Sequence, residues 1–103
     1  MSKYKAVKEV VDGITFASKH EARRYRQLRL MEKSKAIQDL HLQVTFPLIK
    51  KSEHGREIKY IADFVYYDKG HMVVEDAKGY RTDVYKLKKR LMAELYGIDI
   101  KET

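Results

Sequence analysis

Two short stretches of the chain carry charged side chains at spacings that could support chemistry. One is VVEDAKG at residues 73–79, and the other is IADF at residues 61–64. In an extended segment, side chains two residues apart share a face, so Asp76 and Lys78 point to one side and Glu75 points to the other. The spacing therefore predicts an acid and a lysine side by side on one strand.

A second acid is expected to meet this pair. The same alternation puts Ile61, Asp63 and Val65 on one face, and only the tripeptide DKG separates this run from the next, which predicts a hairpin. If Asp63 and Asp76 face the same side, their carboxylates converge, and like charges at close range raise each other's pKa and destabilise the fold. A hard divalent cation with oxygen ligands would relieve that repulsion.

Length, charge and the lack of cysteine limit the kind of protein. The chain has 103 residues, enough for one modest core, so residues 1–103 are expected to form a single domain. The absence of cysteine excludes a disulfide framework and thiolate zinc, and it fits the cytoplasm. No apolar run could span a membrane, and no signal peptide is expected. The formal net charge of +7 favours a polyanionic partner, for which we expect nucleic acid.

The first part of the chain is predicted to form a hairpin and then a helix. Residues 3–16 alternate around the dipeptide DG, which favours a two-residue turn because glycine accepts positive φ. Ser18 and Glu21 form an S-x-x-E capping box that opens a helix ending at about Lys33. The expected buried stripe of this helix is Ala22, Tyr25, Leu28 and Met31.

Three strands are expected next, as an antiparallel meander. They are predicted at residues 41–50, 57–67 and 71–78, joined by short loops. The first of them is expected to carry Leu42, Val44 and Phe46 on one face.

A second helix and a short strand complete the predicted fold. Thr82 is a candidate N-cap for a helix from residue 83 to about 96, which Gly97 ends. Its expected apolar stripe is Val84, Leu87, Leu91 and Leu95. A strand at residues 98–100 would return parallel to the sheet. We therefore expect an α/β (α+β) fold: an N-terminal hairpin at residues 1–17, then an αβββαβ core at residues 18–103, with a central mixed sheet flanked by two helices.

The ordered set of motifs resembles the PD-(D/E)XK nuclease superfamily, which has the restriction-endonuclease-like fold. The motifs are SKHEARRY, LHLQVTF, YIADFVYYDKG, VVEDAKG and YKLKKRL, and they cover nearly the whole chain. Within the superfamily they are similar to those of small uncharacterised phage and prophage proteins. One departure is that no proline precedes the first acid, where the chain has Ile61, Ala62 and Asp63.

The resemblance implies a site for Mg²⁺ or Mn²⁺. Asp63, Asp76 and the carbonyl oxygen of Ala77 would be metal ligands, and Glu21 would complete the metal shell directly or through water. Lys78 would be the catalytic lysine. The catalytic set implied in this way is Glu21, Asp63, Asp76 and Lys78.

Further residues are implied around this site. Gln43 resembles a polar position near the active site of related nucleases. Glu75 adjoins Asp76 but lies on the opposite face unless a bulge intervenes, so either could be the main ligand on the strand. Side chains of the two helices, and of the segment after Lys78, would contact nucleic acid, mainly at its phosphates. These side chains are Arg23, Arg24, Tyr80, Arg81, Lys86, Lys89 and Arg90.

The function expected from the resemblance is metal-dependent hydrolysis of DNA by an endodeoxyribonuclease of phage or prophage origin, acting in the bacterial host cytoplasm without a small-molecule cofactor. A homodimer is expected because one such domain cuts one strand, and cutting two requires two sites related by a dyad. Two alternatives stay open: a Holliday-junction resolvase or replication-linked nickase, and a non-catalytic DNA-binding module on a nuclease fold. Without any function, Asp76 and Lys78 would be a surface ion pair worth under about 1 kcal/mol.

Overall fold

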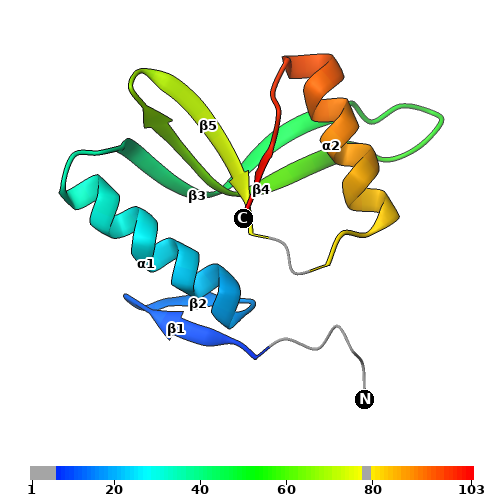
Figure 1. Cartoon of the computed structure of the whole chain (residues 1–103). Coiled ribbons are helices and arrows are strands. Elements are labelled where there is room, and N and C mark those ends of the chain that lie inside the picture. The colour runs from blue at the N-terminus through cyan, green and yellow to red at the C-terminus, as the bar shows by residue number, and fades with distance from the viewer. Residues whose placement is uncertain (1–6, 78–79) are drawn as a thin grey trace.

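A mixed four-stranded sheet with a helix on either side forms the body of the protein (Figure 1). The structure, a computed structural model, describes residues 7–77 and 80–103. Its elements, in order, are β1 (Glu9–Val11), β2 (Ile14–Phe16), α1 (Lys19–Lys33), β3 (Gln38–Ile49), β4 (Ile58–Asp68), β5 (His71–Asp76), α2 (Asp83–Tyr96) and β6 (Lys101–Glu102). The predicted fold class and element order are therefore confirmed.

The strands pair as the sequence predicted. The large sheet has the order β3-β4-β5-β6, in which β6 runs parallel to β5 and the other pairs are antiparallel. The last strand lies at Lys101–Glu102 rather than at the predicted residues 98–100, because Ile98 and Ile100 are used for core packing. No helix in the described ranges is long and apolar enough to cross a membrane.

Two cores lie on the two sides of the sheet, and we name them by the helix that covers each. The α1 core consists of Phe16, Ala22, Tyr25, Leu28, Ile37, Phe64, Tyr66 and Ala77. The α2 core consists of Leu48, Tyr60, Ala62, Val65, Val74, Tyr85, Met92 and Ile100. Each helix thus holds one side of the sheet by burying apolar area.

The N-terminal hairpin packs on α1. Asp12 and Gly13 both have positive φ, 53° and 75°, which confirms the predicted two-residue turn. The hydroxyl of Tyr25 donates a hydrogen bond of 2.9 Å to the carboxylate of Asp12, and the rings of Tyr25 and Phe16 lie 4.9 Å apart. These contacts fix β1 and β2 against the first half of α1.

The start of α1 is set by the predicted cap. The hydroxyl of Ser18 accepts a hydrogen bond of 3.1 Å from the backbone N–H of Glu21, and the helix runs to Lys33 as expected. The predicted stripe is confirmed, since Ala22, Tyr25 and Leu28 are buried and Met31 packs at the margin of the α1 core. Glu21 is therefore held in the first turn by an ordered backbone.

At Gln43, the inward-facing side chains of strand β3 switch from one core to the other. Leu42 packs against the α1 core, whereas Val44 and Phe46 pack against the α2 core. Between them, Gln43 has a φ of 53°, in the left-handed region that non-glycine residues rarely adopt. The prediction that Leu42, Val44 and Phe46 share one face was wrong, because this residue bends the strand and reverses its alternation.

Strand β4 changes cores at the same level. Ala62 and Val65 both lie in the α2 core although they are three residues apart, and Ile61 is exposed. In the register of β3 and β4, Asp63 stands opposite Gln43. The predicted common face of Ile61, Asp63 and Val65 was therefore wrong for Ile61. We call the paired strands β3 and β4 the bent ribbon. The bend places Asp63 at the point where the side chains of this ribbon change from one core to the other.

Helix α2 is capped as predicted, but the face that it buries differs from the predicted one. The hydroxyl of Thr82 accepts a hydrogen bond from the backbone of Tyr85, and Gly97 ends the helix with a φ of 66°. The helix buries Tyr85 and Met92, whereas the predicted stripe is largely exposed. The exposed fractions are 62% for Val84, 57% for Leu87 and 53% for Leu95.

Tyr85 determines which face of α2 is buried. A shift of one residue rotates a helix by about 100°, and here the rotation brings the hydroxyl of Tyr85 within 2.8 Å of the carboxylate of Glu102. The ring of Tyr85 also packs near that of Tyr60, with 6.4 Å between centroids. A buried ring with a bonded hydroxyl outweighs the smaller aliphatic side chains of the predicted stripe.

The bend at Gln43 predicts an unusual response to glycine. In an extended strand, substitution by glycine costs about 1 kcal/mol, but at a left-handed residue the relief of backbone strain offsets that cost. We expect Gln43→Gly to leave the free energy of unfolding within about 0.5 kcal/mol of the wild type. The matched variant Thr45→Gly, two residues along β3, should lose about 1 kcal/mol.

Urea unfolding of the two variants measures this difference. An equal loss of stability in both would show that Gln43 stores no strain in β3.

Candidate functional site

Three carboxylates from three elements gather beside the bend of β3 and β4. The register of β4 and β5 pairs Phe64 with Glu75 and Val65 with Val74, so Asp63 and Asp76 come next along the two strands, and a side-chain hydrogen bond joins them. Directly opposed side chains of an antiparallel pair share a face. The predicted convergence of Asp63 and Asp76 is therefore confirmed.

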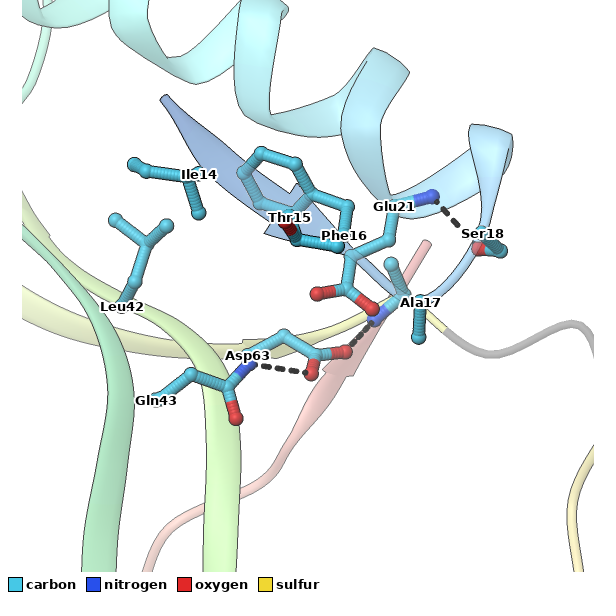
Figure 2. Close-up of a pocket in the computed structure, with 10 residues that line it drawn as sticks. Ile14, Thr15, Phe16, Ala17, Ser18, Glu21, Leu42, Gln43 and Asp63 are labelled. Atoms are coloured by element: carbon cyan, nitrogen blue, oxygen red, sulfur yellow. Dashed lines mark hydrogen bonds between the residues drawn. The ribbon is translucent and has the colours of Figure 1, made fainter. Parts of the chain in front are cut away.

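Asp63 and Glu21 line a common pocket of about 710 Å³. Figure 2 shows their carboxylates pointing toward each other, one from α1 and one from β4. The side-chain amide of Gln43 donates a hydrogen bond of 3.4 Å to Asp63 Oδ1, and the backbone N–H of Ala77 donates one of 2.9 Å to Asp63 Oδ2. Both oxygens of Asp63 are thus oriented by neighbouring strands.

The electrostatics of the site are dominated by Asp63. Burial, followed by the negative charges of Asp76 and Glu21, raises the pKa of its carboxyl group to about 7, and the hydrogen bond from the N–H of Ala77 opposes the rise. A hydrogen bond with the Asp76 carboxyl acts in the same direction as burial. Asp76 and Glu21 therefore lie close enough to Asp63 to destabilise its charged form.

Asp76 is fully buried behind this pocket. The hydroxyl of Tyr60 donates a hydrogen bond of 2.5 Å to Asp76 Oδ2, and the backbone N–H of Thr103 donates one of 3.0 Å to the carbonyl oxygen of Asp76. Burial and the bond to Asp76 raise the pKa of Tyr60, so this phenol stays protonated and keeps donating. This role of Tyr60 could not be predicted from the sequence, because no local spacing relates Tyr60 to Asp76.

Glu75 lies on the other face of β5, as strand alternation predicted. Its buried carboxylate is bound by the guanidinium of Arg24, by the hydroxyl of Tyr66 at 2.6 Å and by the hydroxyl of Thr103 at 2.9 Å. Burial alone would raise the pKa of Glu75, but these hydrogen bonds lower it overall. Asp76 rather than Glu75 is therefore the acid of β5 that faces Asp63.

The basic residues expected to contact nucleic acid divide into two groups. Arg24 is tied to Glu75, while Arg81 and Lys89 form ion pairs with Glu102 at 2.9 Å and 3.3 Å. The other members of the set, Arg23, Tyr80, Lys86 and Arg90, are exposed, and so is Arg81 despite its ion pair. Lys78, the expected catalytic lysine, lies outside the described residues.

The donor set suits a divalent cation in part. Across residues 7–77 and 80–103, no three His, Cys, Asp or Glu side chains form an assembled metal-binding group. However, Mg²⁺ commonly keeps several waters and takes only one or two carboxylates with substrate phosphates, so a complete protein shell is not needed. The neighbouring acids raise the pKa of Asp63. A divalent ion bound to these carboxylate oxygens would stabilise the charged form of Asp63.

Residues 1–103 match a family described as "Protein of unknown function (DUF1064)". Among curated proteins, none matches the chain. A crystal structure of protein VC1899 from Vibrio cholerae is 18% identical with a TM-score of 0.42, over 92% of this chain and 35% of that one. A likeness at this TM-score establishes neither fold nor function. The resemblance to the PD-(D/E)XK nucleases therefore stays a prediction.

The raised pKa of Asp63 predicts a pH-dependent stability. Between its ordinary value of 3.8 and about 7, the folded protein keeps a proton on Asp63 that the unfolded chain has lost. Stability must therefore fall as pH rises through this range. In metal-free buffer we expect Asp63→Asn to gain about 3 kcal/mol over the wild type between pH 4 and pH 8.

Urea unfolding at a series of pH values measures the gain, and Asp68→Asn, at the last residue of β4, serves as the control. A constant difference between Asp63→Asn and the wild type at every pH would contradict the described crowding of carboxylates.

Proposed function

The chain belongs to the DUF1064 family, and we propose that it is a metal-dependent endodeoxyribonuclease that uses Mg²⁺ or Mn²⁺ to hydrolyse phosphodiester bonds in DNA. The observation that carries this proposal is the meeting of Glu21, Asp63 and Asp76 from three separate elements beside one pocket. Evolution of a stable fold alone would not favour such mutual repulsion. The order of elements agrees with the PD-(D/E)XK resemblance, which supports the same chemistry.

The metal would be held by the acids of the pocket. Asp63, Asp76, the carbonyl oxygen of Ala77 and Glu21 are the proposed ligands. When bound, the cation supplies positive charge at the phosphate and lowers the pKa of water. Because Gln43 and the N–H of Ala77 already orient the carboxylate of Asp63, little reorganisation is needed before it binds a cation.

The overall reaction is hydrolysis of a phosphate diester. A water oxygen forms a bond to phosphorus while the bond from phosphorus to one ester oxygen breaks, and a proton passes from the water to the departing oxygen. We assign Lys78 the task of neutralising charge that develops at the phosphate, as the resemblance implies. Tyr60 would keep Asp76 in place throughout, because its raised pKa prevents it from losing the donated proton.

Binding of DNA would rest on the exposed basic residues. Arg23 on α1 and Lys86 and Arg90 on α2 are accessible to phosphates. Such contacts position the backbone without reading its sequence. A homodimer is part of the proposal, since two sites related by a dyad are needed to cut both strands of a duplex or a junction.

Asp63→Ala should abolish Mg²⁺-dependent nicking of supercoiled plasmid while the affinity for DNA in Ca²⁺ is retained. The reason is that the alanine removes a proposed metal ligand and leaves the phosphate-binding side chains intact. Agarose electrophoresis and fluorescence anisotropy measure the two properties, and Asp68→Ala at the far end of β4 is the matched control.

If Asp63→Ala nicks DNA as fast as Asp68→Ala does, the catalytic assignment fails. Metal-independent binding with no cleavage by the wild type, on duplex, flap and four-way substrates, would instead favour the non-catalytic DNA-binding module.

The exposed cations of α2 should determine the salt dependence of DNA binding. Each phosphate contact contributes about 0.9 to the slope of log K against log salt concentration. We expect Lys86→Ala and Arg90→Ala each to reduce the slope by about 1, whereas Lys33→Ala, at the end of α1 remote from Glu21, should leave it unchanged. Equal slopes in all three variants would exclude α2 from the DNA interface.

A further inference from the structure

The pocket that contains Asp63 and Glu21 has a second, apolar part. Its remaining lining residues are Ile14, Thr15, Phe16, Ala17, Ser18, Leu42, Gln43 and Ala77. Figure 2 shows the side chains of Ile14 and Leu42 pointing toward each other at one end, and those of Glu21 and Asp63 at the other. One cavity thus joins an apolar end to an acidic end.

The apolar end is built by two elements that are distant in sequence. Ile14 stands on β2, which is held by the packing of the hairpin on α1, and Leu42 precedes the left-handed Gln43 on β3. Ile14 is 37% exposed although it is a large aliphatic residue on an ordered strand. Leu42 is only partly buried against the α1 core. Both side chains therefore keep apolar surface available to a ligand inside the pocket.

We propose that this apolar end is a subsite for one unpaired nucleobase of the DNA substrate, held between Ile14 and Leu42 while its phosphate lies at the acidic end. The inference rests on the proposed function. It assigns β1 and β2, the hairpin, a role in substrate choice: DNA with an unstacked base would bind, and a fully stacked duplex would not fill the pocket.

The size and chemistry of the pocket fit a single nucleotide. Its volume of about 710 Å³ lies within the range of roughly 300–1,000 Å³ that is usual for small-ligand sites. A nucleotide has a flat face that gains from leaving water and a charged end that does not. Aliphatic walls at one end and metal-binding acids at the other match those two parts.

Polar groups beside the apolar end could read the edge of the base. The side chains of Thr15 and Gln43 are both exposed and both line the pocket. A hydroxyl and an amide can each donate and accept hydrogen bonds, so they accommodate different base edges without strict selection. The net charge of +7 makes a polyanionic strand the favoured occupant over a neutral ligand.

The unpaired base could come from a single strand or from a duplex that releases one base from its stack. Both sources present the same chemistry to Ile14 and Leu42. They differ in whether energy must first be spent on unpairing, and the arms of the experiment separate them.

The test uses DNA that contains 2-aminopurine, whose fluorescence is quenched by stacking and rises when the base is unstacked. The probes are a labelled single strand and the same sequence as a duplex, each titrated with the protein in Ca²⁺ and again in EDTA. We expect a rise in fluorescence on binding of the single strand. Ile14→Ala and Leu42→Ala should each weaken this binding by about tenfold, because each removes apolar contacts from the pocket.

Val10→Ala is the matched control, because Val10 stands on the same hairpin, is 63% exposed and does not line the pocket. It should bind as the wild type does. A rise with the duplex as well as the single strand would assign the base to extrusion from the helix, and a rise with the single strand alone would assign it to single-stranded DNA. Circular dichroism confirms that each variant is folded.

The inference is overturned if the fluorescence stays unchanged on binding of both probes, or if Ile14→Ala and Leu42→Ala bind as tightly as Val10→Ala. Its failure is distinguishable from that of the nuclease proposal. Hydrolysis in Mg²⁺ without a fluorescence change refutes the base subsite alone, whereas a pocket-dependent rise without hydrolysis refutes the nuclease alone.

Discussion

The carboxylates of Asp63 and Asp76 are held close together in a partly buried site, and the strands around them must offset the repulsion between their charges. Burial and its acidic neighbours raise the pKa of Asp63 to about 7, so near neutral pH the site readily takes up a proton, and a bound cation would take the place of that proton. The fold tolerates this cost because Tyr60, Gln43 and the backbone of Ala77 fix the two acids by hydrogen bonds. The surrounding strands hold the acids together despite their like charges. A bound divalent ion would stabilise this arrangement.

The bent ribbon of β3 and β4 explains how one small chain can have both a site and two cores. At Gln43 and Asp63 the ribbon passes from the α1 core to the α2 core. The side chains of Gln43 and Asp63 therefore belong to neither apolar core. The hairpin of β1 and β2 closes the space over the bend and turns it into a pocket. The unusual backbone of Gln43 and the acidic site therefore have one structural origin.

Local features of this fold were predictable from the sequence, and features that depend on distant packing were not. The cap at Ser18 and the opposition of Asp63 and Asp76 follow from spacing alone, because each depends on hydrogen bonding within a turn or on strand alternation. The bend at Gln43 has no such signal, since glutamine does not favour a left-handed backbone. The rotation of α2 was missed because it depends on Tyr85 reaching Glu102, a contact between elements that only the folded chain brings together.

We propose that the crowded acids create a cation site at Asp63. Carboxyl-carbon NMR titration of the wild-type protein measures the pKa of this group directly, first in EDTA and then in excess Mg²⁺. We expect a value near 7 without metal and a value well below it with Mg²⁺, because the cation stabilises the charged form. Titration of Asp63 near 4 under both conditions would contradict the account.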